Sequence, residues 1–252
     1  FDERWVETPE LDEKALAVEV TQEAVFYDLT NQILTQAEGV GEILGYGREK
    51  TMLRLFAGAS NSYNYKGTGY NTYQSGGSPP WVNRVSNPIG TSGSFANVDS
   101  ALELFEDMTD PETGREILIS ADTIVHMPRK TTNWHFILNS TEQRTGDASS
   151  SQTLSTPPPS TNGNYNVLSS TILRNIVQEE LTSGNKANAQ EYWWIGQPKK
   201  TFKWMEAWPI RVRQASANEF VMLDRGLIAA YFGNYRGAGA VVEPRYTVQC
   251  TN

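Results

Sequence analysis

The chain contains a single cysteine, two histidines and no long apolar run, and each shortage narrows what the protein can be. Cys250 stands alone, so no internal disulfide can form and a reducing compartment is the expected environment. No apolar stretch approaches the ~20 residues that a membrane-spanning helix needs. No signal-peptide pattern opens the sequence. We therefore expect a soluble protein of the cytoplasm with no membrane partner.

Groupings of residues that carry chemistry are also scarce. His126 and His135 lack Glu-x-x-His spacing, so a metal site would be short of ligands, and no G-x-S-x-G motif marks a nucleophile. Gly39, Gly41 and Gly45 follow a predicted helix with a spacing that differs from the dinucleotide-binding fingerprint, which favours a helix end. The sequence therefore predicts that the protein is not an enzyme and holds no metal or cofactor.

Charge is abundant but unevenly placed. Acids outnumber bases by 29 to 21, and the net charge of -8 does not favour general binding of nucleic acid. Residues 1–42 sum to 2 - 11 = -9, whereas residues 199–252 sum to 8 - 4 = +4. Segments of opposite sign predict that copies of the chain attract each other, although a solvated acidic face explains the first segment equally well.

The apolar pattern mixes helices and strands without βαβ alternation. Spacings of three and four residues predict helices at 21–37, 94–108 and 128–142, and a shorter one at 171–181, and the helix at 128–142 is expected to face inward with Trp134, Ile137 and Leu138. Thr21 is the expected N-cap of the first helix, and Gly39 and Gly41 are expected to end it. Strands are predicted at 117–127, 165–170, 191–195, 201–214 and 227–249, with a low-complexity surface loop at 144–164. This order of elements predicts an α+β fold.

The polar segment 57–93 carries five large aromatic residues, Tyr63, Tyr65, Tyr70, Tyr73 and Trp81. A loop this long is uncommon without a function, and protein interfaces favour tyrosine and tryptophan. We interpret it as an arm that is exposed on an isolated subunit and buried against a neighbour. Its deletion from Tyr63 to Val85 is expected to leave the fold intact, because the predicted helices and apolar strands lie outside it.

Two stretches resemble the major capsid proteins of tailed bacteriophages, whose fold encapsulin nanocompartments share. The first reads Tyr192-Trp193-Trp194-Ile195-Gly196-Gln197-Pro198-Lys199-Lys200, then Phe202, Trp208-Pro209, Asp224-Arg225, Arg236-Gly237 and 240–246, and looks like the family's closing strands. The second, 119–139, is similar to the first strand and helix of the axial domain. The resemblance spans nearly the whole chain.

The resemblance implies the tailed-phage major capsid fold, with a peripheral domain, an axial domain, an extended loop and an N-terminal arm. The implied segments are an N-terminal arm at 1–20, a helix and the start of the peripheral domain at 21–56, the extended loop at 57–93, the spine helix of the peripheral domain at 94–115, the axial domain at 116–200 and closing strands, mostly of the peripheral domain, at 201–252.

The implied function is that of a major capsid protein. It would self-assemble into pentamers and hexamers of an icosahedral head shell around double-stranded DNA, held without sequence-specific contacts. Decoration, portal and scaffolding proteins are the implied partners, the virion is the implied location, and assembly would occur in the host cytoplasm. The alternative is an encapsulin shell, but the 37-residue loop and the Pro-rich 144–164 insert resemble phage proteins more.

The candidate intersubunit contacts are Tyr63, Tyr65, Lys66, Tyr70, Tyr73 and Trp81. Certain relatives lock their shells with a covalent lysine–asparagine bond from the extended loop, and Lys66 would be the donor here. An exposed loop lysine is also explained as an ordinary solvated charge. The start at Phe1 and the acidic segment after it predict that precursor residues are removed during maturation.

Overall fold

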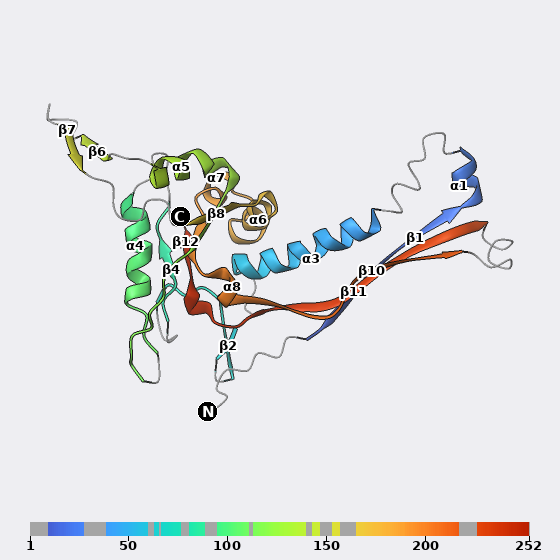
Figure 1. The fold of residues 1–252 in the computed structure, drawn as a ribbon, viewed down its shortest axis with the longest axis horizontal. Coiled ribbons are helices and arrows are strands. Elements are labelled where there is room, and N and C mark those ends of the chain that lie inside the picture. The colour runs from blue at the N-terminus through green and yellow to red at the C-terminus, as the bar shows by residue number, and fades with distance from the viewer. Residues whose placement is uncertain are drawn as a thin grey trace. The chain divides into compact units, whose positions relative to one another are not determined.

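A computed structural model of the chain describes residues 10–27, 39–59, 63–65, 67–76, 81–88, 95–110, 113–139, 143–146, 153–156, 165–216 and 226–251. The chain forms two compact units (Figure 1). Unit 1 is built from Arg54–Lys203 and Val241–Asn252, and unit 2 from Thr8–Leu53 and Trp204–Ala240. Each unit therefore combines segments that are far apart in the sequence.

Unit 2 is a three-stranded sheet with a long helix on one face. The strand order is β1-β11-β10, with β1 at Asp12–Thr21, β11 at Leu227–Val241 and β10 at Phe202–Ser216. β1 pairs antiparallel with the central strand β11. Helix α3 (Val40–Ala57) runs along these strands in Figure 1 and buries Val40 and Leu44 against Tyr235 of β11. The hydrophobic effect thus fixes which face of the sheet the helix covers.

The start of α3 corrects one expectation from the sequence. Gly41 does not end a helix, because α3 begins at Val40 and continues through Gly41, while residues 28–38 before Gly39 lie outside the described part of the chain. A Cβ on Gly41 would lie only 3.3 Å from Val212 of β10, and one on Gly233 of β11 would collide with side chains of α3. Missing side chains let helix and sheet approach closely, so these glycines serve packing.

The end of β1 confirms the predicted cap. The hydroxyl oxygen Oγ1 of Thr21 accepts a hydrogen bond of 3.2 Å from the backbone N–H of Ala24, which stabilises the first turn of helix α1 (Gln22–Tyr27). The rest of the helix that the sequence predicted here, 28–37, lies outside the described residues.

Unit 1 contains a mixed five-stranded sheet in the order β4-β12-β9-β5-β8. The strands are β4 (Arg84–Ser86), β12 (Thr247–Thr251), β9 (Trp193–Gly196), β5 (Thr123–His126) and β8 (Asn166–Ser169). β12 pairs antiparallel with β9 and parallel with β4. All five residues of β12 are buried, so the end of the chain forms the interior of this sheet.

Helices α4 (Phe95–Glu106) and α5 (Thr131–Asn139) share one hydrophobic core with the sheet. Trp134 of α5 contacts Trp193 of β9 with ring centroids 5.0 Å apart. The other predicted inward residues of α5, Ile137 and Leu138, are also buried, which confirms the helix and its orientation. Cys250 lies in the same core, and burial raises the pKa of its thiol well above the ordinary value.

Shorter elements complete unit 1. They are the hairpin β2 (Tyr63–Tyr65) and β3 (Thr68–Tyr70), the pair β6 (Gln143–Gly146) and β7 (Thr153–Thr156), the helices α6 (Thr171–Ile176), α7 (Lys186–Ala189) and α8 (Pro198–Thr201), the 3₁₀ turns η1 (Pro128–Lys130) and η3 (Pro244–Tyr246), and the π-helical turn η2 (Val177–Leu181). The antiparallel pairing of β6 with β7 corrects the expectation that 144–164 is only a loop. The predicted strand at 117–127 is shorter, since only β5 is extended there.

The division into axial and peripheral domains that the resemblance implied stays a prediction, and the packing of α4 and of the closing strands bears on it. Helix α4 was assigned with the closing strands, apart from the axial domain, yet it packs on β5, β9 and β12. β12 itself lies in unit 1, whereas β10 and β11 belong mostly to unit 2. Sequence order alone could not separate these strands, because both kinds are apolar. No helix in the described part of the chain is long and apolar enough to cross a membrane.

Replacing Gly196 by alanine should destabilise unit 1 strongly. Gly196 has a φ of 143°, and a Cβ there would overlap the carbonyl oxygen of Tyr246, which accepts a 2.7 Å hydrogen bond from the N–H of Gln197. We expect a loss of more than about 3 kcal/mol in the free energy of unfolding, measured with urea. Gly76→Ala is the matched control, since its φ of 131° is similar but no atom lies within 4 Å of the new Cβ. Equal losses in the two variants would contradict the account.

Unfolding should also depend on pH through His126, which is buried beside Trp134. Burial lowers its pKa, the nearby His135 lowers it further, and a 2.8 Å hydrogen bond from Nδ1 to the Met127 carbonyl opposes the shift. Because the unfolded histidine still takes up a proton near pH 6.5, the free energy of unfolding should fall below that pH, by at most about 1.4 kcal/mol per unit.

The measurement is chemical unfolding between pH 5.5 and 7.5 for three proteins. The exposed His135 supplies the control, so His135→Asn should retain the pH dependence and His126→Asn should lose most of it. A pH dependence that survives in His126→Asn would assign it to other groups.

Candidate functional site

The aromatic residues predicted for the 57–93 segment form a cluster within unit 1. Trp81 is at its centre, with Tyr63, Tyr65 and Tyr70 packed edge-on or tilted against it at ring-centroid distances of 5.2, 6.0 and 5.5 Å. Trp81, Tyr63 and Tyr65 are buried, and Tyr70 is half-buried. The structure therefore brings four of the predicted contact residues together, but largely inside their own chain.

Of the other two predicted residues, the structure describes only Tyr73. Tyr73 packs on Gly58, whose φ of 72° and missing side chain make room for the ring, and its hydroxyl donates a 2.8 Å hydrogen bond to the Phe56 carbonyl. Burial raises the pKa of Tyr73 well above the ordinary value, so the hydroxyl remains a donor. Lys66 lies outside the described residues.

Asn83 joins this segment to the end of the chain. Its Nδ2 group lies 3.0, 2.9 and 3.2 Å from the carbonyl oxygens of Thr72, Pro244 and Thr247, and its Oδ1 accepts a 2.8 Å bond from the N–H of Gln74. The side chain is fully buried, so each lost partner would leave a costly unsatisfied group. Nothing in the sequence distinguishes this asparagine from the others in a polar loop.

These contacts change the expectation for a deletion of the segment. Removing Tyr63–Val85 would delete Asn83, the aromatic cluster and two residues of β4, which pairs with β12. The premise that the segment contributes nothing to the fold is therefore wrong. The buried rings are not available to a neighbour without local opening, so an intersubunit role for them stays a prediction.

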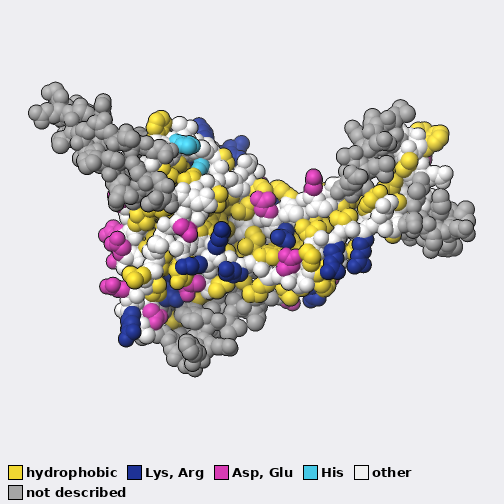
Figure 2. Space-filling model, in the orientation of Figure 1, with side chains coloured by type: hydrophobic (Ala, Val, Ile, Leu, Met, Phe, Trp, Pro, Cys, Tyr) yellow, Lys and Arg dark blue, Asp and Glu magenta, His cyan; other side chains and the backbone are white. Residues whose placement is uncertain are grey.

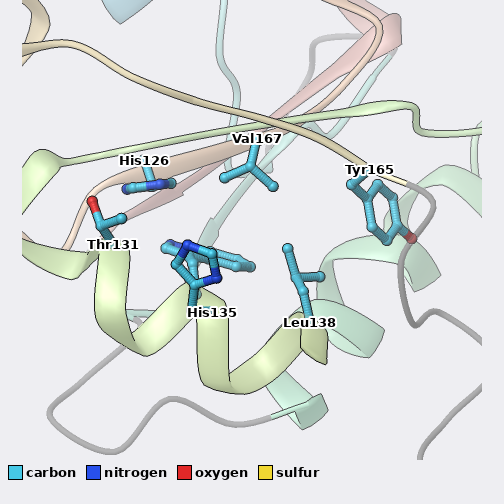
Figure 3. Close-up of a pocket in the computed structure, with 7 residues that line it drawn as sticks. His126, Thr131, His135, Leu138, Tyr165 and Val167 are labelled. Carbon is cyan, nitrogen blue, oxygen red and sulfur yellow. The ribbon is translucent and has the colours of Figure 1, made fainter. Parts of the chain in front are cut away.

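A small pocket lies between α5 and β8 in unit 1 (Figure 3). His126, His135, Trp134 and Tyr165 line it, together with Thr131, Leu138 and Val167. Two imidazoles without a carboxylate make a poor metal site. In the described part of the chain, no three His, Cys, Asp or Glu side chains are grouped to hold a metal ion. The pocket thus offers no chemistry beyond the titration of His126.

Unit 2 differs between the two faces of its sheet. On the covered face, Leu16 and Val18 of β1 pack with Ile210 of β10 against the α3 cluster. Strand side chains alternate between faces, so Glu13 and Glu19 of β1 lie on the opposite, open face. Lys and Arg side chains gather along these strands in Figure 2. Arg211 and Arg213 of β10, which flank Val212, lie on the open face by the same alternation.

Several large apolar side chains are exposed. Phe26 and Tyr27 at the end of α1 are 79% and 71% exposed and contact each other edge-on at 5.3 Å. In unit 1, Phe136 of α5 is 70% exposed and Leu118 is 96% exposed. Exposed aromatic side chains in contact with each other often mark interaction surfaces. The sequence did not indicate such a surface at α1, because the apolar spacing that predicts a helix at 21–37 is typical of a buried stripe.

The fold is that of shell proteins. The chain superposes on the capsid subunit of cyanophage Pam1 with a TM-score of 0.54 and 10% identity, covering 98% of this chain and 78% of that one. For the capsid of cyanophage P-SCSP1u the TM-score is 0.52 and the identity 11%, with 95% and 72% coverage. The SrpI encapsulin of Synechococcus elongatus gives 0.50 and 11%, with 98% and 76% coverage. These likenesses establish the α+β tailed-phage capsid fold that the resemblance implied.

Sequence comparison adds the family. No curated protein matches the sequence. A family model described as phage capsid protein matches residues 6–249, which is nearly the whole chain. The match therefore includes segments of both units and ends within β12. The chain belongs to the phage capsid protein family.

Proposed function

We propose that this chain is a major capsid protein that self-assembles into the pentamers and hexamers of an icosahedral head shell around double-stranded DNA. The observation that carries the proposal is the phage capsid family match over residues 6–249, in a chain with the corresponding fold. Proteins of this family are structural, which agrees with the absence of a catalytic grouping in the sequence. The work of such a protein is self-association.

The exposed surface supports self-association. Phe26 and Tyr27 present two aromatic rings to solvent, and Phe136 presents a third on the other unit. Such residues are the usual anchors of protein interfaces, because burying each ring removes a large apolar area from water. A shell subunit has neighbours on several sides, so its exposed rings can be buried at interfaces. The same rings on a monomer would stay in water.

The charge of the chain supports enclosing DNA without reading its sequence. A net charge of -8 opposes broad attraction to phosphates, so the packaged DNA would be confined by the shell instead of bound to it. The proposed location is the virion, after assembly in the host cytoplasm. Portal, scaffolding and decoration proteins are the further partners that we propose.

An encapsulin shell is the second candidate. The similarity to the Synechococcus elongatus encapsulin, at a TM-score of 0.50 over 98% of this chain, favours it specifically. We prefer the phage capsid over the encapsulin, because the matching family model is one of phage capsid proteins.

Sedimentation velocity and negative-stain electron microscopy of the purified chain test the proposal. We expect closed particles, and their diameter separates the two shells, since a phage head must hold a genome and a compartment only cargo. A chain that remains monomeric at high concentration, with or without scaffolding protein, would overturn both candidates.

The exposed and buried aromatic residues should respond oppositely to substitution. Phe26→Ser with Tyr27→Ser should change the free energy of unfolding by no more than about 0.5 kcal/mol, because both side chains are exposed. Assembly should require at least about tenfold more protein, because interface anchors are lost. Trp81→Ala should instead cost about 3–5 kcal/mol of subunit stability.

Subunit stability is read from urea unfolding of unassembled protein, and assembly from light scattering. Normal assembly of the Phe26/Tyr27 variant would show that α1 faces solvent in the shell.

A further inference from the structure

We propose that the two edges of the unit 2 sheet bind each other between neighbouring copies, with the acidic β1 edge of one copy against the basic β10 edge of the next. This rests on the proposed function, because it specifies how two subunits of a shell meet. The partner is a second copy of the same chain, and the evidence is the complementary charge and the open geometry of the two strands.

Both strands lie at the margin of their sheet. In the order β1-β11-β10, only β11 has a strand on each side within the described residues. β1 is exposed over most of its length, and β10 is exposed throughout residues 211–215. An open edge offers unpaired backbone groups and accessible side chains to another chain.

The two edges carry opposite charge. Residues 10–23, which contain β1, hold five acids and one base, or 1 - 5 = -4. Residues 204–216 of β10 hold two bases and one acid, or 2 - 1 = +1. That acid, Glu206, is already paired with Arg48 of α3 at 3.3 Å, which leaves Arg211 and Arg213 as the free charges of this edge.

Among the residues that the structure describes, Arg211, Arg213, Glu19 and Glu23 make no ion pair. Lys14, the one base of the β1 edge, instead donates a 3.1 Å hydrogen bond to Thr51 of α3. An ion pair made on association would therefore replace water and not an existing intrachain pair.

The charged residues of β1 and β10 also lie at similar positions along the strand direction of the sheet. A Cβ built on Gly233 of β11 would lie 3.7 Å from the carbonyl oxygen of Arg211, so Arg211 is beside Gly233. Gly233 pairs with Leu16 of β1, which places the two arginines near the middle of β1 and close to the level of Glu19. A copy placed alongside with little shift along the strands would bring Glu19 near Arg213.

Contact between two different surfaces of the same protein has a geometric consequence. Such heterologous contacts repeat head to tail, and they close into rings when the rotation between copies divides a full turn. Pentamers and hexamers are rings of this kind. Complementary edges would therefore orient each subunit in its ring, and the exposed aromatic residues would add affinity.

Edge charges have a simpler use, which is to prevent unwanted strand pairing. The two explanations differ when the sign of a charge is reversed. Charges that only prevent strand pairing act with either sign. Complementary charges lose their attraction when one edge is reversed, and regain it when both edges are reversed. This difference defines the experiment.

The experiment compares full-length variants by light scattering and sedimentation. The β10 reversal is Arg211→Glu with Arg213→Glu, the β1 reversal is Glu19→Lys in β1 with Glu23→Lys in the adjoining first turn of α1, and the combined variant carries all four changes. Each single reversal should raise the protein concentration needed for assembly at least about tenfold, and the combined variant should return close to wild type. Circular dichroism and thermal unfolding verify that each variant is folded.

The control is Lys186→Glu with Lys199→Glu, which changes the charge as the β10 reversal does but at exposed positions of unit 1. It should assemble at the wild-type concentration. Assembly of all variants as wild type, or a folded combined variant that does not recover, would overturn the proposal.

Mixing the β10 and β1 reversal variants tests this inference separately from the proposed function. At the exchanged positions the β10 reversal has acids on both edges and the β1 reversal has bases on both edges, so each alone should stay dissociated while an equimolar mixture associates at low salt. If the wild-type protein forms no shell, the proposed function is wrong, but association in the mixture would still support contact between the β1 and β10 edges. A mixture that stays dissociated overturns them.

Discussion

The C-terminal strand β12 is the element on which the rest of unit 1 depends. It lies between β4 and β9, and all five of its residues are buried. The side chain of Asn83 and that of Gln249, which donates a 2.9 Å hydrogen bond to the Ala57 carbonyl, tie two distant segments to it. Unit 1 can therefore reach its final packing only when β12 is paired, since the burial and hydrogen bonding of this strand join segments that are far apart in the sequence.

The packing around β12 determines which surfaces of the subunit remain exposed for association with neighbours. The rings of Tyr63, Tyr65, Tyr70 and Trp81, the Trp81 cluster, pack against each other within the subunit. Their apolar surface is therefore already largely removed from water. The exposed rings of α1 and the charged margins of β1 and β10 are not used in this way. The molecule thus separates a core that holds the subunit together from surfaces that are free to hold subunits to each other.

The sequence predicted the parts whose pattern is local. Helix α5 with Trp134 facing inward and the Thr21 cap follow from spacing and capping chemistry, and the capsid fold followed from resemblance. Helix α3 was missed because Gly41 lies inside it, and a glycine selected for close packing looks the same in sequence as one that ends a helix. The aromatic residues of 57–93 were singled out as contacts between subunits, and that role stays a prediction, because composition cannot tell whether the contacted surface belongs to the same chain. Asn83 left no signal, because its role depends on carbonyls more than 150 residues away.

A cryo-electron microscopy reconstruction of assembled particles, at a resolution that shows side chains, tests the central claim most directly. The account predicts a closed shell in which β12 and the Trp81 cluster stay within each subunit, while density from a neighbour covers α1 and the margins of β1 and β10. A shell in which the Trp81 cluster opens and inserts its rings into a neighbour, with the unit 2 margins facing solvent, would contradict it.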